Sequence, residues 1–91
     1  MSNENQYKEE ILIEELIKSQ NSIFLYNDDI NTFDYVIELL CKYCSHDLVQ
    51  AEQCAWIVHY NGKCIIKRGS YEKLKPICDA LIEGGLKAEI H

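Results

Sequence analysis

The sequence has little of what marks a membrane, secreted or nucleic-acid-binding protein. No run in the 91 residues approaches the length of about 20 apolar residues that crosses a bilayer. The first ten residues, MSNENQYKEE, lack the basic start and apolar core of a signal peptide. Nine Lys and Arg stand against fifteen Asp and Glu, so the net charge of −6 leaves no basic excess for phosphates. We therefore expect a cytoplasmic protein without a nucleic-acid or membrane partner, for which a cationic ligand is better suited.

Cysteine is present, but its pattern does not predict a disulfide framework or a metal centre. The five cysteines are an odd number, and the cytosol keeps thiols reduced. Cys41 and Cys44 form a C-x-x-C pair inside a helical pattern, and neither a second such pair nor an H-x-x-x-H motif follows. We expect no metal and no cofactor. The alternative is a small zinc or thiol protein whose site is completed by nearby residues: His46, Cys54, His59 and Cys64.

The sequence also lacks a recognisable catalytic centre. It contains no G-x-S-x-G nucleophile motif and no glycine-rich phosphate loop. Cys54 and His59 could pair as nucleophile and base, but a separation of five residues places them on different faces of one predicted helix. We expect a protein that is not an enzyme.

Length and periodicity predict one small α+β domain. A chain of 91 residues supports a single hydrophobic core. Bulky β-favouring residues predict short strands, and apolar residues at helical spacing predict helices between them. The order βααβαβ favours a three-stranded antiparallel sheet packed against three helices. The predicted elements are a strand at 22–26, helices at 33–44 and 48–61, a strand at 63–69, a helix ending before Gly84 and a strand at 86–90.

The predicted buried faces follow from the apolar spacing in each helix. The faces expected to pack are, in chain order, Phe33, Val36, Ile37, Leu40 and Cys44; Leu48, Ala51, Cys54, Ala55 and Val58; and Leu74, Ile77, Cys78, Leu81 and Ile82. Residues 1–20 form a separate acidic amphipathic segment, which we interpret either as a mobile extension or as a helix laid on a partner. The domain itself is predicted to span residues 21–91.

Polar residues and glycines mark the expected helix ends. Asn31 is the predicted N-cap of the first helix, with Asp34 in its first turn. Asp47 and Gln50 repeat the arrangement at the second helix, which ends at Gly62.

The third helix contains the only proline of the chain. Pro76 lacks a backbone donor and is best tolerated in a first turn. We therefore expect the regular helix to begin near Lys75, after a looser turn that Ser70 caps.

The junction between the first strand and the first helix carries more polar acceptors than a cap requires. The stretch LYNDDINTFDYVIELL contains four such residues within a span of five positions: Asn27, Asp28, Asp29 and Asn31. Residues of this kind are usually turn formers with one N-cap. A cap uses one oxygen, so the junction has a surplus of acceptors.

This junction, taken with the stretch AEQCAWIVHYNGKC, resembles the ClpS family of small adaptors, which recognise N-terminal degradation signals for Clp proteases. In that family a strand ends in Asn-Asp-Asp, and a later helix ends in Val-His-x-x-Gly-Lys. Asn27-Asp28-Asp29 and residues 58–63 match the two motifs. The similarity covers roughly residues 23–90.

The resemblance implies a binding site for a free chain terminus. An α-amino group is an ammonium with three donors, and a set of acceptors suits it: an amide oxygen, a carboxylate and a neutral imidazole nitrogen. The resemblance assigns these roles to Asn27, Asp28 and His59. It places the first side chain, Leu, Phe, Trp or Tyr, in a pocket of Phe33, Val36, Ala55, Val58 and Leu86, with Asp29 and Asn31 at the rim.

Two departures from the family pattern affect the expected preference. Asn31-Thr32-Phe33 stands where the family usually has Thr-Pro-Met, so a stiffer ring replaces a methionine that acts as a size filter. Ala55 matches a second pocket methionine and deepens the hole that Phe33 narrows. The preferred first residue therefore stays open.

The resemblance also implies a partner for delivery. A monomeric adaptor is expected to dock on the N-terminal domain of a Clp AAA+ unfoldase through Glu72, with Lys73 or Lys75 as the basic counterpart. The alternative is a non-catalytic interaction domain that keeps the fold but has lost or altered recognition of the first residue.

Overall fold

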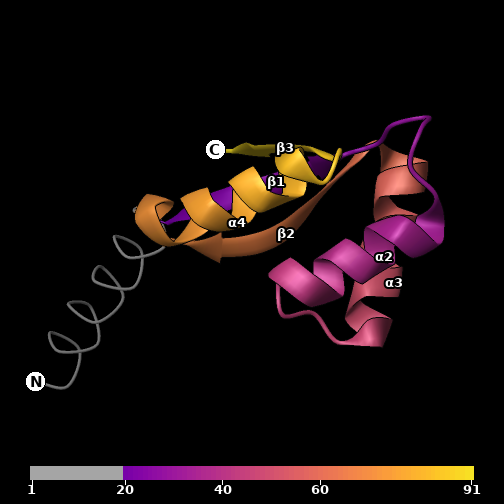
Figure 1. Cartoon of the computed structure of the whole chain (residues 1–91), viewed down its shortest axis with the longest axis horizontal. Coiled ribbons are helices and arrows are strands. Elements are labelled where there is room, and N and C mark those ends of the chain that lie inside the picture. Colours follow the sequence, from indigo (N-terminus) through magenta and orange to yellow (C-terminus); the bar gives the residue numbers. More distant parts are fainter. Residues whose placement is uncertain (1–19) are drawn as a thin grey trace, which may run out of the picture.

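The computed structural model describes residues 20–91 (Figure 1). The acidic segment predicted over residues 1–20 lies outside the described residues except for its last position. The described elements, in chain order, are β1 (Asn21–Tyr26), α2 (Phe33–Tyr43), α3 (Leu48–Asn61), β2 (Lys63–Gly69), α4 (Tyr71–Glu83) and β3 (Lys87–Ile90). Their order confirms the predicted βααβαβ arrangement.

The sheet has three antiparallel strands in the order β2-β1-β3, with β1 at its centre. Ile23 and Leu25 on β1 are 0% and 2% exposed and face the helices, while Phe24 and Tyr26 alternate with them. In Figure 1, α4 runs along the sheet, and α2 and α3 pack against each other beside it. The α+β class, the antiparallel sheet and the three covering helices are therefore confirmed.

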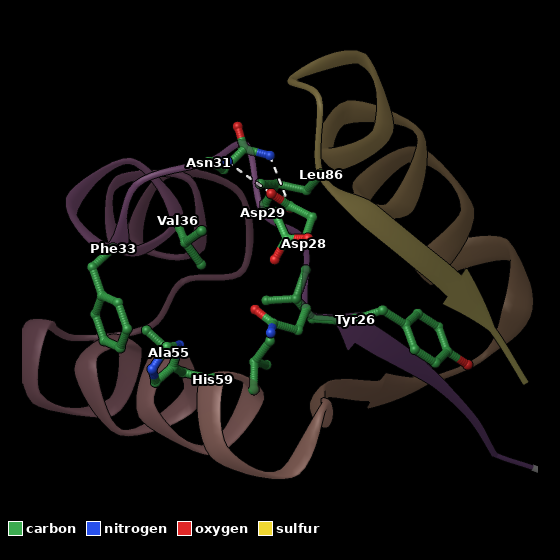
Figure 2. Close-up of a pocket in the computed structure, with 12 residues that line it drawn as sticks. Tyr26, Asp28, Asp29, Asn31, Phe33, Val36, Ala55, His59 and Leu86 are labelled. Atoms are coloured by element: carbon green, nitrogen blue, oxygen red, sulfur yellow. Dashed lines mark hydrogen bonds between the residues drawn. The ribbon is translucent and has the colours of Figure 1, made fainter.

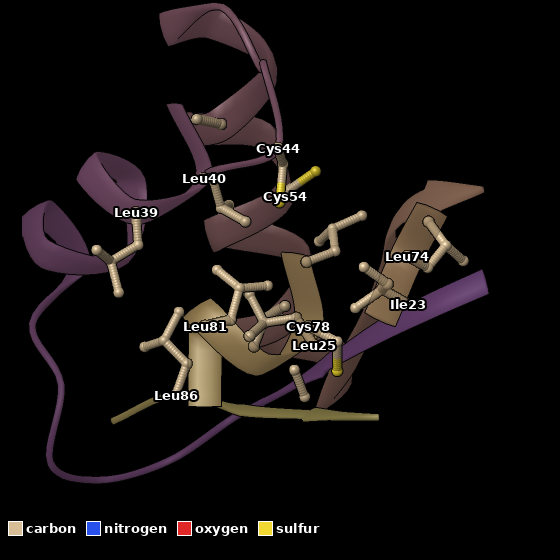
Figure 3. Close-up of a cluster of buried hydrophobic side chains, with 14 residues drawn as sticks. Ile23, Leu25, Leu39, Leu40, Cys44, Cys54, Leu74, Cys78, Leu81 and Leu86 are labelled. Atoms are coloured by element: carbon tan, nitrogen blue, oxygen red, sulfur yellow. The ribbon is translucent and has the colours of Figure 1, made fainter. Parts of the chain in front are cut away.

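The core lies between the sheet and the helices (Figure 3). The largest fully buried side chains come from three of the six elements, β1, α2 and α4: Ile23, Leu25, Leu40, Leu74 and Leu81, with Cys44 at the end of α2.

Two residues predicted to be buried are exposed instead, Leu48 at 60% and Ile82 at 49%. Each lies at a helix end, where no neighbouring element covers it.

The N-cap of α2 differs from the prediction. The cap is Thr32, whose hydroxyl accepts from the backbone N–H of Tyr35 at 3.2 Å. Asn31 has another role, because its side-chain amide donates to both the Asp28 carboxylate and the Gly85 carbonyl, each at 2.9 Å. The sequence placed the cap one residue early, since Asn and Thr are both good caps.

The ends of α3 are as predicted. The Asp47 carboxylate accepts from the backbone N–H of Gln50 at 2.7 Å. Gly62 ends the helix in the left-handed conformation, with φ of 87°, and its N–H bonds the Val58 carbonyl.

The start of α4 is a second correction. The helix is regular from Tyr71, with Ser70 as its N-cap, and includes Pro76, so the expected start near Lys75 is wrong by one turn. An interior proline costs about 3 kcal/mol. Burial of each apolar side chain stabilises the fold by about 1.5–3 kcal/mol, so burial along one face of the helix outweighs the cost of the proline. The buried residues of this face are Leu74, Cys78 and Leu81.

The described thiols are placed as small hydrophobic residues. All five are free, and Cys41 and Cys44 lie within α2 and at its end rather than on a knuckle. Burial raises the pKa of Cys44 to about 11, and burial together with the neighbouring Cys64 raises the pKa of Cys54 to about 12. Over residues 20–91, no group of three or more His, Cys, Asp or Glu is placed to hold a metal ion. No helix in that range is long and apolar enough to cross a membrane.

Candidate functional site

A cavity of about 300 Å³ lies where the end of β1 meets α2, α3 and the residue before β3 (Figure 2). Twelve residues line it: Leu25, Tyr26, Asn27, Asp28, Asp29, Asn31, Phe33, Val36, Ala55, Val58, His59 and Leu86. The ten residues predicted for the amino-group site and the pocket are all among them. Leu25 and Tyr26 are additions, and the ring of Tyr26 points away from the cavity.

Four of the residues that line the cavity form apolar walls. Val36 comes from α2, Ala55 and Val58 come from α3, and Leu86 precedes β3. Ala55, Val58 and Leu86 are each at most 6% exposed, so they are fixed by the core. A ligand entering this space would meet walls that are packed and already dehydrated.

The rim is a hydrogen-bonded acidic turn. Asp28 Oδ1 accepts from the backbone N–H groups of Ile30 at 2.9 Å and Asn31 at 2.7 Å, and Oδ2 accepts from the Asn31 side chain. Asn31 in turn donates to Gly85, next to Leu86 in the cavity wall. The side-chain amide of Asn31 therefore ties the rim to the residues that precede β3.

The Asp28 carboxylate is held in its charged form. Burial acts to raise its pKa, but the hydrogen bonds from Asn31 and Ile30 and the charge of Lys87 together lower the pKa below its ordinary value. Asp28 is therefore ionised at neutral pH. Its Oδ2 receives a single bond and keeps room for another donor.

A backbone contact brings the two sequence motifs together. The N–H of Asn27, just after β1, donates to the carbonyl of Gly62 at 2.9 Å. Gly62 ends α3 three residues after His59. This contact explains why Asn27 and His59, which are far apart in the chain, line the same cavity.

An aromatic cluster on α3 supports one wall of the cavity. The Phe33 ring lies 4.6 Å from Trp56 and 5.6 Å from His59 between centroids, and Trp56 stacks on Tyr60 at 5.4 Å. Trp56 does not line the cavity, but it packs against Phe33, which does line it. Trp56 is not among the residues predicted from the sequence, although its spacing from His59 and Tyr60 places these three on one helix face.

The residues predicted to contact an unfoldase lie elsewhere. Glu72, Lys73 and Lys75 are exposed on α4, and none of them lines the cavity. Lys75 forms an ion pair with Asp79 at 2.8 Å. The structure thus separates the two predicted surfaces, and it leaves Glu72 and Lys73 accessible.

The arrangement combines a negative, acceptor-rich rim with an apolar interior. Such a site suits a ligand with one cationic polar end joined to an apolar group of the size of one side chain.

Comparison with known proteins identifies the family. Residues 17–89 match the family profile described as ATP-dependent Clp protease adaptor protein ClpS. The chain belongs to the ClpS family. Adaptor proteins of this name from Salmonella gallinarum and Erwinia tasmaniensis are each 40% identical to it over 47 residues, which cover 52% of this chain. The matched segment spans 44% of each relative, so less than half of their length is compared.

A solved ClpS structure has the same fold. Agrobacterium tumefaciens ClpS2, bound to L-phenylalaninamide, matches this chain with a TM-score of 0.69 at 18% identity. The match covers 80% of this chain and 95% of that one. At this identity the likeness concerns the fold, which it confirms.

Proposed function

We propose that this ClpS-family chain is a non-catalytic adaptor. It binds the free α-amino group and the large hydrophobic first side chain of a protein, an N-degron, and delivers that protein to a Clp AAA+ unfoldase. The observation that carries the proposal is that Asn27, Asp28 and His59 line the same cavity as a set of apolar side chains.

The proposed roles follow from the chemistry of an ammonium group. The ionised Asp28 carboxylate supplies charge, and the side chains of Asn27 and His59 supply an amide oxygen and an imidazole nitrogen as neutral acceptors. Hydrogen bonds that involve an ionised group contribute about 1.5–3 kcal/mol. Three such acceptors would therefore discriminate strongly between a free and a blocked terminus.

The first side chain is proposed to enter the apolar part of the cavity, between Val36, Ala55 and Leu86. Burial of one Leu or Phe side chain contributes about 1.5–3 kcal/mol. The volume of about 300 Å³ lies at the lower end of the range for ligand pockets, about 300–1,000 Å³, which fits one side chain and the terminal backbone. Leu, Phe, Trp and Tyr are the proposed first residues.

Delivery is proposed to use the exposed face of α4. The N-terminal domain of the unfoldase would contact Glu72 and a basic neighbour, Lys73 or Lys75. The cytoplasmic location and the monomeric state predicted from the sequence belong to the same proposal.

The decisive experiment compares two peptides that differ only at the terminus. A peptide beginning with free Leu should bind in a fluorescence anisotropy titration, and its acetylated form should bind at least tenfold more weakly. Acetylation removes the charge and leaves the side chain intact. Equal affinity for the free and the acetylated peptide would contradict the proposal.

Two variants locate the binding within the cavity. Asp28→Ala and His59→Ala should each weaken binding of the free peptide at least tenfold, because each removes an acceptor from the rim. Glu52→Ala is the matched control, since Glu52 is exposed on α3 and does not line the cavity. If no peptide of the panel binds the wild-type chain, the alternative applies: an interaction domain of the same fold that has lost recognition of the first residue.

A further inference from the structure

Among residues 20–91, β3 is an edge strand of the sheet, in which Ala88 is 6% exposed and Ile90 is half-buried. The strand order β2-β1-β3 gives β3 a single neighbour, which is β1. No other described strand pairs with it. An edge strand of this kind carries backbone donors and acceptors that a further strand can use.

The register shows which groups face outward. Ser22 and His91 exchange two backbone hydrogen bonds, each of 2.8 Å. Hydrogen-bonded and non-hydrogen-bonded pairs alternate along an antiparallel ladder, so Phe24–Glu89 is again a bonded pair. Ala88 lies between the bonded positions of β3, and Ile90 lies between Glu89 and His91. The N–H and C=O groups of Ala88 and Ile90 therefore point away from β1.

Neighbouring hollows that share lining residues lie between the cavity and this edge. An adjoining open hollow shares Tyr26, Asn27 and Leu86 with the cavity and continues to Ala88 and Glu89. A third hollow shares Ala88 and Glu89 with the second one and extends to the end of β3 along α4. The path thus begins at the proposed amino-group site and follows β3 over its length. Its α4 side is formed by Tyr71, Lys75, Cys78, Asp79 and Ile82.

We propose that the degron residues after the first pair with the free edge of β3 as an added strand. This inference rests on the proposed function and names how the same site holds the rest of the peptide. With the α-amino group beside Asn27 and the first side chain beside Leu86, the peptide would run from the start of β3 towards its end. It would therefore lie parallel to β3.

Parallel pairing assigns specific hydrogen bonds. The N–H groups of Ala88 and Ile90 would donate to peptide carbonyls, and their C=O groups would accept from peptide N–H groups two residues apart. Alternate peptide side chains would point to the α4 side of the edge, where Ile82 is 49% exposed and provides an apolar surface.

The length of β3 limits the segment that can be bound. Four strand residues at about 3.3 Å each span about 13 Å, which is the length of about four peptide residues. Side-chain recognition at the first residue and backbone recognition over the following ones would together allow many different sequences after that residue.

The first test measures affinity against peptide length. Leucinamide and peptides of two to seven residues, all beginning with Leu, are titrated against the full chain. Affinity should rise at least tenfold from leucinamide to about five residues and stay constant beyond that. Equal affinity for leucinamide and the longer peptides would overturn the inference while leaving the proposed function intact.

The second test replaces single peptide N–H groups. N-methylation is moved through positions two to five of a six-residue peptide. The added strand predicts an alternating pattern, with losses of at least tenfold at every second position and small losses between. A uniform effect contradicts strand addition, because only alternate amides face β3. If the chain self-associates and the pattern is uniform, the edge belongs to a second copy instead.

A protein variant provides an independent check. Ile90→Pro removes one outward N–H that does not belong to the β1 ladder, and edge strands tolerate proline at such positions. The variant should bind the six-residue peptide at least fivefold more weakly and bind leucinamide as the wild type does. Equal losses for both ligands would contradict the inference. If the variant does not fold, the methylation pattern decides. If the wild-type chain binds neither ligand, the proposed function fails and the inference fails with it.

Discussion

At the residue scale, Asp28 combines a structural role with the proposed binding role. Its two oxygens hold the turn that connects β1 to α2, through bonds to Ile30 and Asn31. The same charge lies at the mouth of the cavity. A carboxylate that is already hydrogen-bonded needs little reorganisation to receive a cation, which favours recognition by a preformed site.

The lowered pKa of Asp28 predicts how stability changes with pH. Its ordinary value is 3.8, and the folded state holds its pKa below that value, so the unfolded chain binds the proton more tightly. The stabilisation is complete above the ordinary value and is lost as the pH falls through the folded value. Wild type should therefore lose more unfolding free energy between pH 5 and pH 2.5 than Asp28→Asn, as measured by urea denaturation.

The Asn variant should also be less stable at pH 7, by about 1 kcal/mol, because its side-chain amide would face the Asn31 amide, donor against donor. Asn31 cannot relieve this by turning, since the same group donates to Gly85. Asp29→Asn is the control, as Asp29 is an exposed neighbour of the same charge. Parallel pH curves for wild type and Asp28→Asn would show that the hydrogen bonds to Asp28 do not contribute to stability.

The residues that the two motifs predicted for the site line one cavity in the structure, and their roles there stay a prediction. Asn27, Asp28 and His59 are polar residues in excess of what turns and caps require, and the resemblance gave them one role. Trp56 was missed, because its helical spacing from His59 shows a shared face but does not show that Phe33 of α2 packs on that face. Thr32 was missed as the cap because the Asn31 side chain binds the carbonyl of Gly85, a residue that is distant in sequence.

At the element scale, helix ends decide where the site residues lie. The left-handed Gly62 stops α3 and turns its carbonyl to Asn27, so the end of one element fixes the end of another. The elements themselves were predictable from alternation in the strands and from apolar spacing in the helices. The start of α4 was placed one turn late, because a local rule about proline was given more weight than the burial of a whole helix face.

The helix α4 offers a direct test of that balance. Pro76→Ala should raise the free energy of unfolding by about 1–3 kcal/mol, because alanine restores the hydrogen bond from position 76 to the Glu72 carbonyl and removes the ring. The gain in unfolded-chain entropy reduces this by about 0.4–1 kcal/mol. Thermal and urea denaturation give the difference.

Lys73→Ala is the matched control for this substitution, because Lys73 is exposed on the same helix and should change stability by a few tenths of a kcal/mol only. An unchanged or lower stability of Pro76→Ala would indicate that α4 has adjusted its backbone to the proline.

At the scale of the whole molecule, the sheet and its helices hold the cavity and the first turn of α4 apart. The cavity lies at one end of β1, and Glu72 and Lys73 lie in the first turn of α4, at the other end of the sheet, next to the end of β2. An adaptor needs such a separation, because it has to hold a substrate and a partner at once. The net charge of −6 favours a cationic terminus over an anionic one through the field of the whole protein.

This separation predicts that binding and delivery can be lost independently. The double variant Glu72→Ala with Lys73→Ala should bind a Leu-initiated peptide within twofold of wild type, because neither residue lines the cavity. It should slow degradation of a Leu-initiated reporter by a reconstituted Clp unfoldase and peptidase at least fivefold. His59→Ala should show the opposite pattern. Its peptide affinity should fall, and degradation should slow only by as much as the weaker binding explains. Anisotropy titration and the degradation assay, run on the same preparations, measure the two effects. If the α4 variant loses peptide binding as well, the two surfaces are coupled, and the assignment of α4 to the unfoldase is wrong.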